Sequence, residues 1–253
     1  MIEIRNLRAG YSGKTILHEL SAVIPDSGLT VIIGPNGCGK TTLLKTLCGI
    51  LPAESGEILL NGQNIRTLQP KLLARQIAYL SQSRQIPDIT VKRMVLHGRF
   101  PYLSYPRHYR PEDLRIAEKA MVQMGISDLA DTPLATLSGG QRQKVYIAMA
   151  LAQDTPTVLL DEPTTFLDIS QQLQTMAHAR ALSDSGKTVV MILHDLSLAL
   201  QNADSILLMD RGQVIMQGTP EEVYASGSLE TVFGVKIGRT RTPQGWQYYF
   251  SAK

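Results

Sequence analysis

A glycine-rich loop, set between an apolar run and a helical run, limits what this chain can fold into. Residues 34–42 read Gly-Pro-Asn-Gly-Cys-Gly-Lys-Thr-Thr and match G-x-x-x-x-G-K-[ST] at every position. The β-branched run at 29–33 predicts a buried strand before the loop, and the leucine-rich run at 43–47 predicts a helix after it. Strand, glycine loop and helix in this order predict a phosphate-binding loop, in which backbone N–H groups and a helix N-terminus face an anion.

The loop residues are expected to surround the phosphates of a nucleotide. The Lys40 ammonium would reach the β- and γ-phosphates, and the Thr41 hydroxyl would ligate Mg²⁺. A plain glycine turn is the alternative, but the flanking strand and helix argue against it. The predicted nucleotide contacts are Gly34, Pro35, Asn36, Gly37, Cys38, Gly39, Lys40, Thr41 and Thr42.

Two adjacent carboxylates mark the end of a second buried run. Residues 157–160 are apolar or β-branched and lead into Asp161 and Glu162. Because adjacent residues of a strand point to opposite sides, the two acids can take different roles. Asp161 would hold Mg²⁺ through water, and Glu162 would face the γ-phosphate and orient or deprotonate the attacking water.

Gln82 and His194 follow two further predicted strands, at 77–81 and 188–193. Gln82 is either a surface residue or an amide that ligates Mg²⁺ or holds the attacking water. Parallel sheets bind ligands at the carboxyl ends of their strands, so His194 could donate to the γ-phosphate and sense its presence. The predicted catalytic residues are Glu162, His194, Lys40 and Gln82, and the predicted Mg²⁺ ligands are Thr41, Gln82 and Asp161.

A second candidate anion site precedes a long helical run. It consists of Leu137, Ser138, Gly139, Gly140 and Gln141. Ser138 can cap the helix, and the two glycines leave its first backbone N–H groups uncovered. A simple cap and turn is the alternative. Two anion sites with a single loop lysine suggest a nucleotide held between two molecules.

The strand and helix patterns together predict an α/β fold. They indicate a phosphate-loop nucleotidase core with an antiparallel β subdomain, for which the alternating residues at 2–7 and 15–24 are typical. Between 84 and 153 helical patterns replace strand patterns. We interpret this segment as a helical lobe inserted into a core lobe formed by residues 1–83 and 154–253, all within a single domain.

Inside the helical lobe, Pro111 begins a predicted helix that Gly125 ends. Its apolar spacing predicts one buried face, formed by Leu114, Ala117, Ala120, Met121 and Met124. At the end of the chain, residues 235–251 predict a hairpin, to which we assign no role.

Composition excludes several classes of protein. A net charge of +3 is too small to indicate nucleic-acid binding. The longest apolar runs have the length of a strand and fall short of the ~20 residues that span a bilayer. The N-terminus shows no signal-peptide pattern, and Cys38 and Cys48 are expected to be reduced thiols. The histidines and cysteines lack the spacing of a metal cluster.

Basic and aromatic residues interleave at 99–110, in the order Arg-Phe-Pro-Tyr-Leu-Ser-Tyr-Pro-Arg-His-Tyr-Arg. The prolines favour an irregular, exposed loop. A partner interface, a solvated loop and a single-strand nucleic-acid platform are the three interpretations, with the interface favoured.

Together, these motifs give the whole chain a close resemblance to the ATP-binding-cassette ATPases. The Leu-Ser-Gly-Gly-Gln run at 137–141, between phosphate loop and acidic strand, is highly specific to that family. The resemblance implies that Tyr11 stacks on adenine, that Gln82 is the Q-loop glutamine and His194 the switch histidine, and that Leu167 and Asp168 form the D-loop. It also implies a head-to-tail homodimer that closes on ATP with Mg²⁺ and reopens after hydrolysis.

A narrower resemblance points to importers of iron-siderophores, haem, cobalamin and metal oxyanions such as molybdate. It rests on 98–102, on 163–169 and on 194–196. It implies two separate permease subunits, a substrate-binding protein upstream, and a peripheral location at the cytoplasmic face of the inner membrane. The 97–110 segment would lie near the docking face. The cargo is left open, no nucleic acid is expected, and a soluble ABC ATPase acting on nucleic acid, ribosomes or cofactor assembly is the alternative.

Overall fold

The computed structural model describes residues 1–82, 86–165, 167–243 and 245–253. The helices are α1 (Lys40–Leu47), α2 (Pro70–Leu73), α3 (Val91–His97), α4 (Pro111–Gln123), α5 (Gly139–Ala152), α6 (Ile169–Asp184), α7 (Leu196–Asn202), α8 (Pro220–Ala225) and α9 (Ser228–Phe233). The strands are β1 (Ile2–Tyr11), β2 (Lys14–Ile24), β3 (Gly28–Ile33), β4 (Ser55–Leu60), β5 (Gln63–Asn64), β6 (Ile77–Leu80), β7 (Thr157–Leu160), β8 (Thr188–Ile192), β9 (Ser205–Asp210), β10 (Gln213–Gly218), β11 (Val235–Thr242) and β12 (Gly245–Ala252). None of these described helices is long and apolar enough to cross a membrane.

A six-stranded sheet in the order β10-β9-β3-β8-β7-β6 forms the centre of the molecule. All its pairings are parallel except that of β9 with β10. The strand before the phosphate loop, β3, is therefore flanked by β8 and β9, which come more than 150 residues later. The carboxyl ends of β3, β6, β7 and β8 meet at one edge, where the predicted catalytic residues follow.

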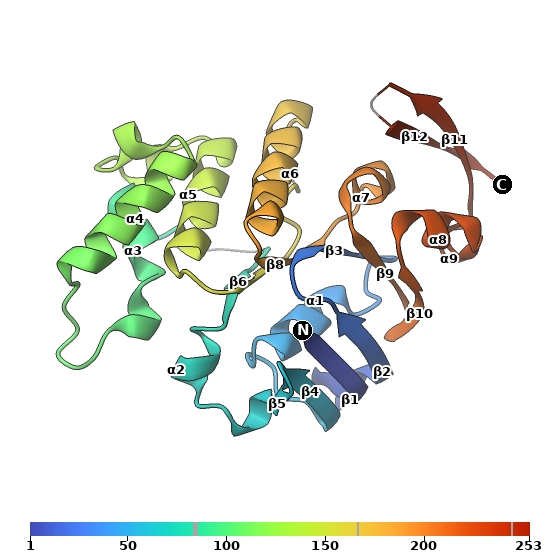
Figure 1. The fold of residues 1–253 in the computed structure, drawn as a ribbon, viewed down its shortest axis with the longest axis horizontal. Coiled ribbons are helices and arrows are strands. Elements are labelled where there is room, and N and C mark those ends of the chain that lie inside the picture. The colour runs from blue at the N-terminus through green and yellow to red at the C-terminus, as the bar shows by residue number, and fades with distance from the viewer. Residues whose placement is uncertain (83–85, 166, 244) are drawn as a thin grey trace.

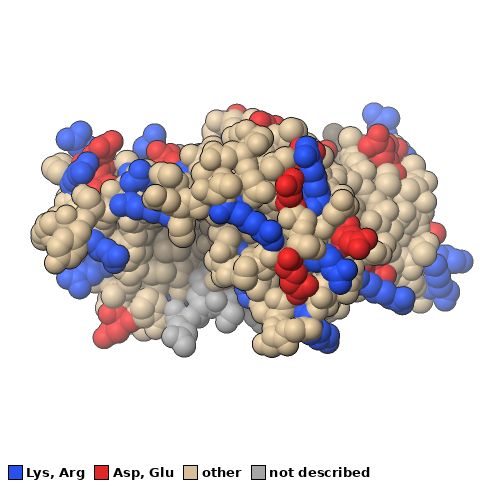
Figure 2. All heavy atoms as spheres, turned by 90° about the horizontal axis from the view of Figure 1, so that it is seen from below, with Lys and Arg blue, Asp and Glu red and all other residues tan. Residues whose placement is uncertain are grey.

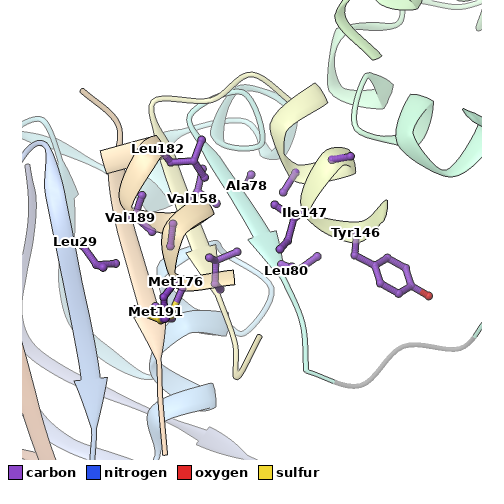
Figure 3. Packing of buried hydrophobic residues seen from close by; sticks show 14 of the residues in the cluster. Leu29, Ala78, Leu80, Tyr146, Ile147, Val158, Met176, Leu182, Val189 and Met191 are labelled. Carbon is purple, nitrogen blue, oxygen red and sulfur yellow. The ribbon is translucent and has the colours of Figure 1, made fainter. Parts of the chain in front are cut away.

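Alternate residues of these strands pack into two separate cores, because both faces of the sheet are covered. On β8, Val189 and Met191 join the core on the α6 side, while Val190 and Ile192 join the core around α1. Figure 3 shows Met176 and Leu182 of α6 near Val189 and Met191 in the first of these cores. The short β-branched runs that predicted buried strands are thus buried on both sides.

The phosphate-loop helix α1 lies between two sheets. Its Leu43, Leu44 and Leu47 pack between the six-stranded sheet and a four-stranded sheet of order β2-β1-β4-β5. The antiparallel pairing of β1 with β2 was predicted, although both strands are longer than expected. The α/β core with an antiparallel β subdomain that the sequence predicts is therefore present.

Helices α3, α4 and α5 gather at one end of the molecule, away from the four-stranded sheet (Figure 1). They lie inside the segment 84–153, although the boundaries of the proposed lobes remain a prediction. The predicted buried face of α4 is wrong at Leu114, which is 42% exposed. The polar neighbour Asp113 is buried there instead, because it pairs with Arg99.

Arg99 and Asp113 form a buried ion pair at the start of the aromatic-basic segment. Arg99 Nε donates to Asp113 Oδ1 at 2.9 Å, and its Nη1 donates to the carbonyl of Ala152 at 2.9 Å. The guanidinium also lies 3.8 Å from the ring centroid of Tyr102. Instead of an irregular loop, this part of the segment is a short 3-10 helix at Phe100–Tyr102.

The predicted C-terminal hairpin is confirmed as β11 and β12, and it packs against α7. Tyr248 anchors it in the core, and Ser197 Oγ donates to the Tyr248 carbonyl at 3.2 Å. In the view of Figure 2, lysines and arginines are interspersed with acids. Among the described residues on that face, neither sign of charge forms an extended tract.

The Arg99–Asp113 pair makes a prediction about stability. Burial alone would raise the pKa of Asp113, but the Arg110 N–H and the Arg99 guanidinium outweigh burial and lower this pKa. Its contribution is therefore present above the ordinary aspartate pKa of about 4 and is lost as the pH falls below it. Replacing Asp113 with Ala should lower the free energy of unfolding at pH 7 by about 3–5 kcal/mol, because Arg99 stays buried without a counter-ion. Urea unfolding at pH 7 measures this, and a loss below 1 kcal/mol would contradict it.

Candidate active site

The phosphate loop connects β3 to α1 and requires glycine at its tight points. A Cβ at Gly34 would lie 2.1 Å from the Met209 carbonyl oxygen, so only glycine allows this approach to β9. Gly39 precedes α1 with a φ of 105°, which L-residues rarely adopt. A Cβ there would also lie 2.8 Å from Leu17. The loop is therefore held in place by packing against both sheets.

Lys40 is turned back onto its own loop. Its ammonium donates to the carbonyls of Gly34 at 2.7 Å and Pro35 at 2.9 Å, and the residue is 5% exposed. These carbonyls occupy positions around the ammonium that phosphate oxygens could take. Cys38, a predicted nucleotide contact in the same loop, is buried and does not line the cavity described below, and burial raises the pKa of its thiol.

A cavity of about 210 Å³ opens above the loop. Its lining residues are Tyr11, Ile16, Asn36, Gly37, Gly39, Lys40, Thr41, Thr42 and Glu162. Tyr11 was expected on a loop, but it is the last residue of β1 and pairs with Lys14. Tyr11 is 43% exposed as a residue, and the Lys45 ammonium lies 5.9 Å from the centroid of its ring. An exposed ring at the mouth of the cavity is available for stacking.

Asp161 follows β7 and is almost fully buried. Thr41 Oγ1 donates to its Oδ1 at 3.0 Å, and the Tyr79 hydroxyl donates to its Oδ2 at 2.9 Å. Burial raises the pKa of Asp161 more than these two hydrogen bonds lower it. The structure thus brings together two of the three predicted Mg²⁺ ligands, and both offer the oxygen atoms that Mg²⁺ prefers.

The Glu162 carboxylate contacts residues that follow the three strands β6, β7 and β8 at this edge of the sheet. Its Oε2 accepts from Gln82 Nε2 at 2.5 Å and from Thr165 Oγ1 at 3.2 Å. Its Oε1 lies 2.6 Å from Nε2 of His194. Gln82 is therefore bonded to Glu162 and not to Asp161, so the third predicted Mg²⁺ ligand is not assembled with the other two.

The backbone of Glu162 has a φ of 49°, a left-handed conformation that costs about 1 kcal/mol or more for a residue with a Cβ. This turn separates the two acids. Asp161 is directed to Thr41 and Tyr79, whereas Glu162 lines the cavity. The sequence-based expectation that they serve different partners agrees with this arrangement.

The predicted signature residues lie outside that cavity. Ser138 Oγ accepts from the Gln141 N–H, and Gln141 Oε1 accepts from the Ser138 N–H, so that a capping box begins α5. Leu137 is buried, whereas Gly139 is exposed and a Cβ on it would meet open space. Within one chain, this second anion site does not meet the first.

Gly140 differs from Gly139 in its packing. It is buried, and a Cβ there would lie 2.5 Å from the side-chain amide of Gln171 on α6. The predicted D-loop residue Asp168 caps the same helix, with Oδ1 accepting from the Gln171 N–H at 2.8 Å. Leu167, the other D-loop residue, is part of the turn that leads into Asp168, and its N–H donates to the Thr164 carbonyl.

Sequence reasoning missed Tyr79, Thr165 and Gln171. Tyr79 could have been found, because it has the one polar side chain in the otherwise apolar strand β6, which pairs with β7 just before the two acids. Nothing in the sequence alone pointed to Thr165 or Gln171, because their partners are set by the turn after β7 and by the packing of α6.

Comparison with known proteins agrees with this geometry. Residues 17–165, more than half of the chain, match the family described as "ABC transporter". The chain belongs to the ABC transporter family. It is 42% identical to the achromobactin transport ATP-binding protein CbrD of Dickeya dadantii, over 92% of this chain and 88% of that protein. It is 41% identical to the ferric enterobactin transport ATP-binding protein FepC of Escherichia coli, over 91% of this chain and 86% of FepC.

A solved structure of this family resembles the fold closely. It is described as "an inward-facing conformation of a putative metal-chelate type ABC transporter", and it has a TM-score of 0.85 and 25% identity over 99% of this chain and 96% of that chain. The predicted family, the ABC ATPase fold and an ATPase activity coupled to transport are thus confirmed. Both relatives are named as transport ATP-binding proteins.

The two signature glycines should respond differently to alanine. Gly139→Ala places a methyl group in open space and should change the free energy of unfolding by less than about 0.5 kcal/mol. Gly140→Ala forces the Gln171 amide aside and should cost about 1 kcal/mol. Adding Gln171→Ala should restore most of that loss. Urea unfolding of the three variants tests this, and equal stability of both single variants would contradict it.

Proposed function

We propose that the chain powers an importer whose cargo is an iron(III) chelate of the siderophore type. One observation supports the proposed ATP hydrolysis above all. The Glu162 carboxylate lines the cavity beside the phosphate loop and contacts Gln82 and His194 there. The cargo is supported by relatives named for achromobactin and ferric enterobactin transport. A soluble ABC ATPase acting on nucleic acid, ribosomes or cofactor assembly is not favoured.

In the proposed mechanism, Tyr11 stacks on adenine and the loop N–H groups hold the phosphates. Lys40 leaves the carbonyls of Gly34 and Pro35 and pairs with the β- and γ-phosphates. Mg²⁺, held by Thr41 and Asp161, would neutralise charge on these phosphates. The chain holds Asp161 ready for this by burying its carboxylate against two hydroxyl donors.

Glu162 then acts on the attacking water as general base or orienting group. In this structure its two oxygens are taken by Gln82, Thr165 and His194. Nucleotide must therefore draw Gln82 and His194 away before Glu162 can hold water. His194 would then bond the γ-phosphate, so that hydrolysis is possible only with a triphosphate in place.

The second anion site supports a head-to-tail homodimer in the proposed cycle. Residues 138–141 lie outside the nucleotide cavity of their own chain, and exposed Gly139 has room for an approaching phosphate. Each ATP would lie between one loop and the partner's signature residues. Closure on ATP and reopening after hydrolysis would move two permease subunits at the cytoplasmic face of the membrane, with a substrate-binding protein upstream.

Glu162→Gln tests the assignment of the base. The amide keeps the size of the side chain but cannot accept a proton, so turnover should fall by about 10²-fold or more while ATP binding persists. Phosphate release and binding of a fluorescent ATP analogue measure the two effects. Gel filtration with ATP should show this variant as a dimer, and near-normal turnover would require another base.

Variants of the 97–110 segment test whether it forms the docking face for the permease. Phe100 is 45% exposed, with its ring stacked on that of Tyr109 and tilted against that of His97, and Tyr105 is 96% exposed. Tyr102 is less suitable for mutation, because its ring packs on Arg99 and its hydroxyl bonds the Gln153 carbonyl. Phe100→Ser with Tyr105→Ser should remove most of the permease from the tagged chain in detergent extracts, while ATP binding is kept.

Val122→Ser is the matched control for this experiment, since Val122 is an exposed apolar residue of α4 outside the segment. It should leave the permease bound. Mass spectrometry of the co-purified material identifies the membrane protein. Recovery of ribosomes, DNA or assembly factors without a polytopic membrane protein would overturn the transport proposal, and retention of the permease by the double variant would overturn the docking face.

A further inference from the structure

Tyr79 lies on the strand beside the one that carries the two acids. Strands β6 and β7 pair in parallel, with Tyr79 opposite Leu159 and Leu80 opposite Leu160. The Asp161 N–H continues the ladder by donating to the Leu80 carbonyl at 2.9 Å. This register leaves the Tyr79 ring on the α1 side of the sheet, and its hydroxyl reaches the Asp161 carboxylate.

The two oxygens of Asp161 are thereby given different partners. Oδ1 accepts from Thr41, which belongs to the phosphate loop and lines the nucleotide cavity. Oδ2 accepts from Tyr79, which is half-buried between the sheet and α1. Because Asp161 is only 1% exposed, water has little access to its Oδ2 atom. The phenol therefore takes the place that a water molecule would hold at a more open carboxylate.

We propose that Tyr79 is a positioning residue for the Mg²⁺ of the nucleotide complex. By holding Oδ2, its hydroxyl fixes the rotation of the carboxylate, so that Oδ1 stays beside the Thr41 hydroxyl at the metal position. This assignment rests on the proposed function of Thr41 and Asp161 as metal-holding residues. Groups that orient a ligand in this way usually matter 10–100-fold for metal affinity.

A phenylalanine at this position would fill the same space without the hydroxyl. Oδ2 would then be buried without the Tyr79 donor, and an unsatisfied charged acceptor in a protected site is unfavourable. The carboxylate would relieve this by rotating toward other donors, which would move Oδ1 from Thr41. The expected defect is therefore in the Mg²⁺-dependent part of nucleotide binding, and the contacts that bind the base and phosphates directly are unaffected.

The experiment measures the Mg²⁺ requirement of nucleotide binding in the full-length chain. A fluorescent ATP analogue is titrated at fixed protein concentration, first in EDTA and then at increasing Mg²⁺, for wild type and Tyr79→Phe. The Mg²⁺ concentration at half-maximal binding should rise about tenfold in the variant, with the affinity in EDTA unchanged. Mn²⁺ followed by electron paramagnetic resonance gives an independent readout of metal binding.

Two matched variants control for other effects. Tyr249→Phe makes the same chemical change on the exposed surface of the C-terminal hairpin. Thr155→Val removes a buried hydroxyl that bonds the Thr157 carbonyl at 2.6 Å at the start of β7, so it reports a loss of stability in the same sheet. Both should keep the wild-type Mg²⁺ requirement.

The outcomes separate this assignment from the proposed function. An unchanged Mg²⁺ requirement in Tyr79→Phe, with normal Mg²⁺-dependent binding by wild type, would overturn the role of Tyr79 alone. Equal weakening of binding in EDTA and in Mg²⁺ would show a general structural role and would overturn it too. Nucleotide binding by wild type that is independent of Mg²⁺ would overturn the proposed metal site and this assignment with it.

Discussion

The placement of β3 between β8 and β9 is the constraint on which the rest of the structure depends. Because both faces of this sheet are covered, its central strands β3, β8 and β7 carry no charged side chains, and the charged groups follow at the strand ends. The carboxyl edge is where β3, β6, β7 and β8 end together, and it carries the phosphate loop, Gln82, the two acids and His194. The chemistry is therefore a consequence of which strands are neighbours.

At that edge the nucleotide and the protein's own groups compete for the same partners. The Lys40 ammonium is satisfied by two carbonyls, and the Glu162 carboxylate by an amide, a hydroxyl and an imidazole. Each of these contacts has to give way for the proposed reaction. A site whose groups satisfy one another keeps its shape and stays inactive until a ligand offers them better partners.

Much of the fold could be predicted, because strand-length apolar runs and helix caps are local signals. The loop at 34–42, the cap at Ser138 and the hairpin near the C-terminus all follow from neighbouring residues. The errors arose at residues whose environment is set by a partner residue and not by their own local pattern. Asp113, which pairs with Arg99, is buried, whereas the neighbouring Leu114 is exposed. Tyr11 extends a strand because Lys14 pairs with it across the turn.

The candidate site shows the same division. Residue types and spacing were enough to nominate Thr41, Asp161, Glu162 and His194, and the structure brings Thr41 to Asp161 and Glu162 to His194. The contact of Gln82 with Glu162 and that of Tyr79 with Asp161 depend on the register of β6 against β7. This register is set by pairing between segments far apart in the sequence, and it cannot be predicted from the residue pattern of either strand alone.

The long separation of β3 from its neighbours also has a consequence during synthesis. About 155 residues lie between the end of β3 and the start of β8, which a ribosome translates in roughly 8 to 30 s. Helix α1 and the four-stranded sheet can cover one face of β3 early, since they are complete by residue 64. The other face, with Leu29, Val31 and Ile33, has to wait for α6 and the later strands. For that interval the nascent chain presents an apolar strand with open edges, which is the kind of surface that chaperones bind.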